Sequence, residues 1–207
     1  MGFDVEGIVK AVGYLGLFAI IFAETGLLIG FFLPGDTLLI SAGLLIQQDK
    51  VNLDLWFLIP LLILAAVLGD AVGFEIGKHT GPRLFNRPDS RLFKRDHLER
   101  AQRFYEKHGG KTIIAARFLA FIRTFAPTVA GAAQMPYLRF AVFNIIGAAL
   151  WVTTMIGLGY FFGKTIPAEA VDLFFIGLLG VMVLASVAPA AWHLWRQRRR
   201  AQSGSGA

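Results

Sequence analysis

The stretch that decides the fold is residues 115–134, AARFLAFIRTFAPTVAGAAQ, which is mostly apolar but carries Arg117 and Arg123. An arginine at the centre of a bilayer costs about 2.5 to 3.5 kcal/mol to insert, so two of them in one segment indicate a function. Pro127 cannot donate a hydrogen bond to the carbonyl of Arg123, four residues back. Because broken backbone at membrane depth is tolerated only when it is buried or lines a watery cavity, the stretch predicts one wall of an anion site.

The composition places the chain in the membrane class. Of its 207 residues, 56% are hydrophobic and only 16% are charged, and the mean hydropathy is +0.60. The net charge of +6 comes from basic segments that flank apolar runs, as the positive-inside rule describes, so we expect no nucleic-acid partner. The chain has no cysteine and only four histidines, spaced far apart; we therefore expect no metal site and no cofactor.

The apolar run 12–46 is too long for one crossing. As a straight helix it would cover about 52 Å, whereas the hydrocarbon core is about 30 Å thick. Breaks are predicted at residues 24–26 and at Pro34 and Gly35, so the run forms either two crossings or a helix followed by a re-entrant hairpin with Pro34 and Gly35 at its tip. Asp36 after this break also fits a plain helix N-cap.

Charge bias favours the re-entrant alternative. We expect transmembrane helices at about residues 8–23, 55–77, 140–162 and 171–194, and re-entrant hairpins at about 24–46 and 112–136. A cytoplasmic amphipathic segment covers 78–111, and a basic, flexible tail covers 196–207. With a hairpin at 112–136, both basic segments and both termini lie on the cytoplasmic side, and residues 1–195 form a single membrane domain.

Two short correspondences suggest an internal repeat. Glu24 lies ten residues before Pro34, as Arg117 lies ten residues before Pro127. The sequence Gly-Phe-x-x-Gly-Lys at 73–78 returns as Gly-Tyr-x-x-Gly-Lys at 159–164. Inverted repeats with discontinuous helices are typical of transporters. The predicted fold is thus an all-α polytopic membrane protein, an inverted repeat of re-entrant helical hairpin plus transmembrane helix, with an additional C-terminal transmembrane helix.

The charges at membrane depth have opposite signs in the two halves. Glu24 and Asp36 lie in the first half, and Arg117 and Arg123 in the second. Because isolated charges in lipid are costly, we expect contact between the two hairpins; a network of ion pairs that only holds them together is the alternative. The arginines are six positions apart, about 120° around a helix, so a break at Pro127, or unwinding before it, is expected to bring them together.

The end of the second run, GDAVGFEIGK at residues 69–78, carries two more acids. Gly69, Gly73 and Gly77 follow at four-residue spacing and predict a small-residue face for close packing of another helix. Asp70 and Glu75 lie near Lys78, so we expect them to be half solvated and rank them as secondary candidates.

At these residues the chain resembles the DedA family of bacterial inner-membrane proteins, whose core is shared with eukaryotic VTT-domain lipid scramblases. The resemblance covers about residues 15–164. It rests on Phe22-Ala23-Glu24, Leu33-Pro34-Gly35-Asp36, Gly69-Asp70-x-x-Gly73-Phe74-x-x-Gly77-Lys78, Arg117-Phe118 and Arg123-Thr124-x-x-Pro127-x-x-Ala130-Gly131. One departure is Ala120, where relatives often have proline, which bears on the bend between the arginines.

The resemblance implies a polytopic fold with two re-entrant hairpins and a role in moving lipid phosphates, notably undecaprenyl phosphate, or phospholipids with dependence on the proton gradient. Its charged functional positions correspond to Glu24, Asp36, Arg117 and Arg123. Guanidinium groups offer forked donors that match a phosphate, and protonation of Glu24 or Asp36 would release the arginines to hold it.

We therefore expect a proton-motive-force-dependent lipid flippase of the bacterial inner membrane, moving a phosphate-bearing lipid such as undecaprenyl phosphate. Its partners are that lipid or a phospholipid, together with protons, and self-association into a homo-oligomer is left open. The alternatives are a phosphatidylethanolamine flippase or scramblase and a proton-coupled transporter of a small ion. A lipid phosphatase would want a histidine near the arginines, whereas all four histidines lie in polar segments or near a helix end, at His79, His97, His108 and His193. We therefore expect no enzyme.

Overall fold

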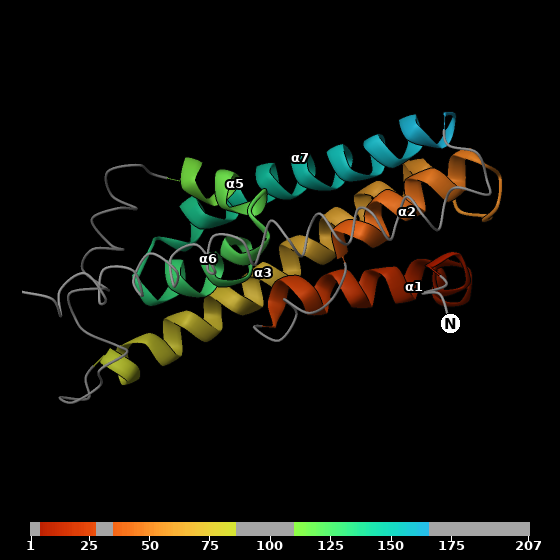
Figure 1. Cartoon of the computed structure of the whole chain (residues 1–207). Coiled ribbons are helices and arrows are strands. Elements are labelled where there is room, and N and C mark those ends of the chain that lie inside the picture. Colours follow the sequence, from red (N-terminus) through yellow and green to blue (C-terminus); the bar gives the residue numbers. More distant parts are fainter. Residues whose placement is uncertain (1–4, 28–34, 86–109, 166–207) are drawn as a thin grey trace, which may run out of the picture.

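The computed structural model describes residues 5–27, 35–85 and 110–165, and all regular structure in these ranges is helical. The helices are α1 (Val5–Gly26), α2 (Gly35–Gln47), α3 (Leu55–Phe85), α5 (Lys111–Arg117), α6 (Ala120–Ala132) and α7 (Tyr137–Gly163) (Figure 1). Pro34, the predicted last crossing 171–194, most of the segment 78–111 and the tail 196–207 lie outside the described residues.

Two of the described helices are long and apolar enough to cross a membrane, over Leu55–Gly81 and Tyr137–Gly163. These match the predicted crossings at 55–77 and 140–162. Helix α3 continues to Phe85, so its last turns extend into the predicted segment 78–111. Asp54 caps this helix, because its Oδ1 accepts the backbone N–H of Phe57 at 2.9 Å.

The first helix of the apolar run 12–46, α1, ends at Gly26, within the break predicted at residues 24–26. Helix α1 also bends at Gly13, whose φ of 53° is a conformation that glycine adopts without strain. Helix α2 begins at Gly35 and holds 13 residues, about 20 Å of helix. This helix is too short to cross a bilayer core of about 30 Å.

The predicted break at Pro127 itself is wrong, and the chain instead takes the other predicted alternative, unwinding before Pro127. Pro127 lies inside α6, and the chain breaks earlier, between α5 and α6. There the N–H of Leu119 bonds the carbonyl of Ala116 three residues back, and Leu119 itself is extended with φ −112° and ψ 101°. Ala120, the position at which the resembled family often has proline, starts α6 directly after this break. Helix α6 tolerates Pro127 because neighbouring helices support a membrane helix through a proline.

Two pairs of helices pack at very short range. Helix α2 lies along α7, and α6 lies along α3 (Figure 1). A Cβ built on Gly159 would lie 1.9 Å from the carbonyl oxygen of Ile40, and one on Gly77 would lie 1.9 Å from that of Thr128. The small-residue face predicted on α3 is therefore used for packing, as expected.

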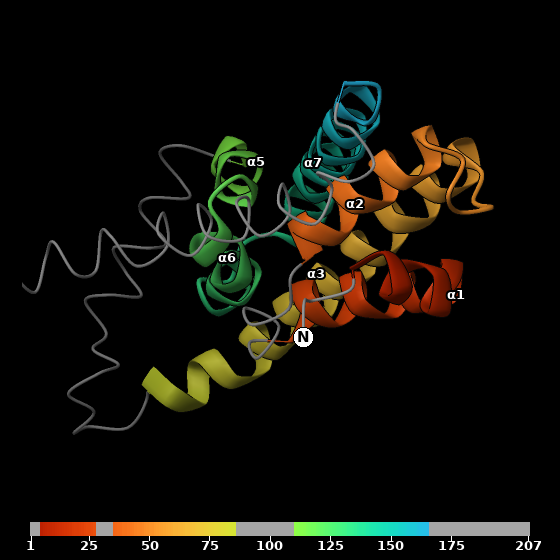
Figure 2. The ribbon, with the colours of Figure 1, turned by 45° about the vertical axis from the view of Figure 1, so that its right-hand side comes forward.

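The arrangement brings the two halves of the chain together. Figure 2 shows α5 and α6 on one side of the molecule and α1 with α2 on the other. Helices α3 and α7 contact each other and both sides. Side chains from all six helices can thus meet near the middle of α3 and α7.

Candidate functional site

Arg123 of α6 contacts two carboxylates from the first half of the chain. Its Nη1 donates to Oδ1 of Asp36 at 2.5 Å, and its Nη2 donates to Oε1 of Glu24 at 2.6 Å. Glu24 lies in the last turn of α1, and Asp36 lies in the first turn of α2. The predicted contact between acids of the first half and an arginine of the second is therefore present. Helix α2 begins at Gly35, so Asp36 lies inside its first turn and not at the predicted N-cap, and its side chain holds this ion pair.

Glycine at position 35 leaves room for the Glu24 carboxylate. A Cβ built on Gly35 would lie 1.5 Å from Oε2 of Glu24. This oxygen is buried against the glycine without a hydrogen bond of good geometry. Besides its predicted role as a chain break, Gly35 leaves space for the Glu24 carboxylate, because any larger residue would displace that carboxylate.

Arg117 of α5 has a different set of partners. Its guanidinium donates to Oδ2 of Asp70 on α3 and to Oδ1 of Asn144 on α7. The amide nitrogen of Asn144 donates in turn to the backbone carbonyl of Val67 at 3.2 Å, which fixes the orientation of the amide. Gly147 of α7 lies beside the Arg117 side chain, since a Cβ there would be 3.4 Å from Nε.

Trp151 of α7 lies beside both arginines. Its indole Nε1–H donates to Oδ1 of Asp36 at 2.8 Å. The guanidinium carbon of Arg123 lies 4.7 Å from the centroid of the indole ring, and that of Arg117 lies 5.9 Å away. Both distances are within the range of a cation–π interaction. One buried ring therefore contacts both guanidiniums and one of their acids.

The prediction that Asp70 is half solvated is wrong. Asp70 is only 5% exposed and forms the ion pair with Arg117. It lies eight residues before Lys78, about 12 Å along the helix, which is deep enough to reach the packed centre. Asp70 therefore belongs with Glu24, Asp36, Arg117 and Arg123 in one buried charged cluster, to which we refer as the charge cluster.

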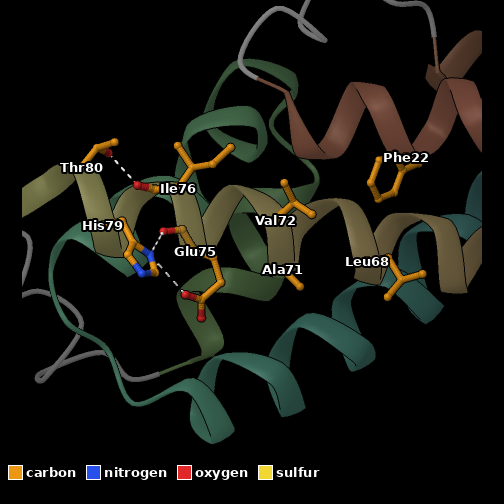
Figure 3. Close-up of a pocket in the computed structure, with 8 residues that line it drawn as sticks. All are labelled: Phe22, Leu68, Ala71, Val72, Glu75, Ile76, His79 and Thr80. Carbon is orange, nitrogen blue, oxygen red and sulfur yellow. Dashed lines mark hydrogen bonds and ion pairs between the residues drawn. The ribbon is translucent and has the colours of Figure 1, made fainter.

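Glu75 lies outside the charge cluster and is half exposed, as predicted. Its side chain is 45% exposed and pairs with Lys78 at 3.8 Å and with His79 at 3.5 Å. It lines a groove of about 660 Å³ along the opposite face of α3, which Figure 3 shows with Phe22 of α1 at one side. The other lining residues are Leu68, Ala71, Val72, Ile76, His79 and Thr80. The groove is mostly apolar and carries none of the five charges of the cluster.

The charge cluster is closely packed. Glu24, Asp36, Asp70 and Arg117 are each at most 7% exposed, and the Arg123 side chain is 10% exposed. The cavity beside the two arginines has a volume of only about 10 Å³, at most the size of one water molecule. A phosphate can reach the guanidiniums only if these side chains separate.

The charges of the cluster do not balance. Three carboxylates face two guanidiniums, so full ionisation leaves one negative charge in excess. Burying an unpaired charge is costly, and the cluster is therefore suited to bind a proton. No group of three or more His, Cys, Asp or Glu in residues 5–27, 35–85 and 110–165 is arranged to hold a metal ion.

Sequence reasoning missed Asn144 and Trp151. An amide inside an apolar membrane helix is a signal for a polar partner, and Asn144 could have been found in this way. Trp151 gave no comparable signal, because a tryptophan in an apolar run is ordinary core material. Its contacts with the arginines arise only when α7 packs beside α2 and α5.

Comparisons with known proteins agree with these features. The VTT domain family matches residues 33–161. The chain is 46% identical to Protein DedA of Escherichia coli over 182 residues, which are 87% of this chain and 83% of that protein. It is 41% identical to an uncharacterized membrane protein of Mycobacterium leprae over 196 residues, which are 94% and 86% of the two chains.

A second protein of Escherichia coli, the inner membrane protein YqjA, is 40% identical over 153 residues, which are 73% of this chain and 68% of that protein. No solved structure matches. The matched region contains Asp36, Asp70 and both arginines of the charge cluster. On this evidence the chain belongs to the DedA family of membrane proteins and carries a VTT domain.

Proposed function

We propose that this protein is a lipid translocase of the bacterial inner membrane that moves a phosphate-bearing lipid, such as undecaprenyl phosphate, and uses the proton gradient. The observation that carries the proposal is the charge cluster itself. Five charged side chains from α1, α2, α3, α5 and α6 meet in the interior of a membrane protein. Ionisable groups at membrane depth typically mark a path for ions or substrates.

Stability alone is a weak reason to keep such a cluster. Buried ion pairs are often no more stabilising than apolar packing of the same volume. The two guanidiniums instead offer forked donors that match the oxygens of a phosphate. A lipid phosphate would compete with the carboxylates for the same N–H groups, and this competition supports a binding role.

In this proposal, protonation of the acids allows a phosphate to replace the carboxylates at the arginines. Protonation of Glu24 or Asp36 weakens the hold of that acid on Arg123, and protonation of Asp70 does the same for Arg117. The freed guanidiniums then bind the phosphate, and loss of the protons restores the internal ion pairs and expels it. The excess of one carboxylate supports this coupling. When the cluster is packed without a phosphate, binding a proton removes the cost of one buried unpaired charge.

The packing supports the proposed inverted repeat of hairpin plus crossing. Helix α2 of the first half packs along α7 of the second, and α6 of the second half packs along α3 of the first. This exchange of partners is expected of two related units that face each other in opposite orientation. We propose with it that both termini lie in the cytoplasm and that the chain is a transporter without catalytic activity or cofactor.

The test is transport by the full-length protein in liposomes. Labelled undecaprenyl phosphate, labelled phosphatidylethanolamine and a soluble oxyanion are compared with and without a pH gradient. Wild type, Arg123→Ala and Arg117→Ala are measured beside Arg139→Ala, which removes an exposed arginine of α7. We expect gradient-dependent transport of undecaprenyl phosphate that both cluster variants lose by at least tenfold and the control keeps.

Other outcomes separate the alternatives. Equal transport by Arg123→Ala and wild type refutes the phosphate site. Transport of phosphatidylethanolamine at the same rate identifies a phospholipid flippase or scramblase. Transport of the soluble ion without any lipid identifies a proton-coupled carrier.

A further inference from the structure

Helix α7 contributes neutral side chains to both arginines of the charge cluster. Asn144 contacts Arg117, and Trp151 contacts Arg123. The two residues are seven positions apart, which places them two turns apart on the same face of a helix. Both are buried, with exposed fractions of 1% and 0%. One face of α7 therefore lies against both guanidiniums.

The contact of Trp151 leaves the donors of Arg123 available. The ring lies 4.7 Å from the guanidinium carbon, whereas the N–H groups donate to Asp36 and Glu24. A cation–π contact uses the positive charge without accepting a strong hydrogen bond. A phosphate that replaces the two carboxylates would thus meet a guanidinium that the ring still holds.

Asn144 holds Arg117 in a similar way. Its amide oxygen accepts from Arg117, while its amide nitrogen donates to the carbonyl of Val67 on α3. The amide carries no charge and does not titrate, so it keeps its place when Asp70 takes up a proton. The second arginine therefore also has a partner that is independent of the protonation state.

We propose that Trp151 and Asn144 are positioning residues that keep the two guanidiniums in place while their carboxylates are exchanged for a phosphate. This inference rests on the proposed function and adds the residues that determine the affinity of its site. Because the neutral contacts persist, the exchange requires no rebuilding of the arginine side chains. Preorganised donors bind an anion more tightly than donors that must first be ordered.

The experiment measures binding of farnesyl phosphate, a short isoprenyl phosphate, to the full-length protein in detergent by titration calorimetry. Trp151→Leu should weaken binding about tenfold to thirtyfold, since a desolvated cation–π contact is lost. Trp151→Phe keeps an aromatic face and should stay within about threefold of wild type. Trp56→Leu, at a tryptophan that is 83% exposed, is the matched control and should not change affinity.

Asn144→Leu tests the second arginine at nearly constant volume. We expect binding to weaken about fivefold to tenfold because Arg117 loses a neutral partner.

Inorganic phosphate is titrated in parallel with farnesyl phosphate. Binding of farnesyl phosphate without binding of inorganic phosphate assigns the site to a lipid, and equal binding of both assigns it to the free anion.

Thermal unfolding of each variant separates positioning from a structural role. If Trp151→Leu lowers the unfolding temperature while the folded protein binds with wild-type affinity, the inference is overturned and the proposed function stands. The same holds if Trp151→Phe is as weak a binder as Trp151→Leu. If wild type binds farnesyl phosphate no better than Arg123→Ala does, the proposed function and this inference both fall.

Discussion

The substitution Gly35→Ala tests whether the backbone of α2 makes room for the charge cluster. A Cβ at this position would lie 1.5 Å from Oε2 and 2.4 Å from the carboxyl carbon of Glu24. The carboxylate ends a flexible side chain and can move, but it is 2% exposed and bonds Arg123 at 2.6 Å. The methyl group of the alanine therefore acts mainly by pushing the carboxylate of Glu24 away from Arg123.

The cost follows from the size of the overlap. Forcing one extra methyl group into a packed interior costs about 1 to 3 kcal/mol. In a chain of this length each kcal/mol lowers the unfolding temperature by about 2 to 4 °C, so Gly35→Ala should lower it by about 2 to 12 °C. The assay is thermal unfolding of the full-length protein in detergent, followed by tryptophan fluorescence.

Gly157→Ala is the matched control. A Cβ on Gly157 would have no atom within 4 Å, and alanine favours a helix over glycine by about 1 kcal/mol. The control should keep or raise the unfolding temperature. A second comparison places Gly35→Ala in a Glu24→Ala background, where the overlapping carboxylate is gone and the substitution should be nearly neutral.

Two results would refute this reasoning. One is an equal effect of Gly35→Ala and Gly157→Ala on the unfolding temperature. The other is an undiminished effect of Gly35→Ala after Glu24 has been removed, because the two substitutions would then be independent.

Two further predictions concern the packing and the second arginine. Gly77→Ala places a Cβ 1.9 Å from a backbone carbonyl oxygen of α6 and should cost about 1 to 3 kcal/mol, whereas Gly73→Ala, with its nearest atom at 3.5 Å, should cost nothing. Equal unfolding temperatures for this pair would contradict the close packing of α3 and α6. Asp70→Asn leaves Arg117 without its carboxylate and should cost about 3 to 5 kcal/mol, whereas Glu75→Gln breaks only half-exposed pairs and should cost less than about 1 kcal/mol. Chemical denaturation in detergent measures both, and similar costs would show that Asp70 is not a buried partner.

Much of the fold could be predicted because it depends on local pattern. The apolar runs and their lengths predict the crossings at 55–77 and 140–162. The spacing of Gly69, Gly73 and Gly77 predicts the packing face of α3, and the polar residues at 24–26 predict the end of α1. Each of these signals lies within a few helical turns of the feature that it predicts.

The position of the second break could not be read in the same way. Proline is the strongest local breaker, yet Pro127 lies within α6 because α3 supports that helix through close contacts at Gly77 and Gly131. The chain instead breaks at Leu119, in an apolar stretch without a breaker. A local propensity of a few kcal/mol was outweighed by packing against a neighbour.

For the site, the sequence by itself determined which residues are too costly to leave in lipid. Glu24, Asp36, Arg117 and Arg123 stand out because a charge at membrane depth needs a partner, whatever the fold. Only the tertiary structure decided which residues are these partners. Arg123 pairs with both acids of the first half, and Arg117 contacts Asp70 and Asn144. These partners are 27 to 99 positions apart in the chain, and their pairing is fixed by which helix faces meet, a property that no local spacing carries.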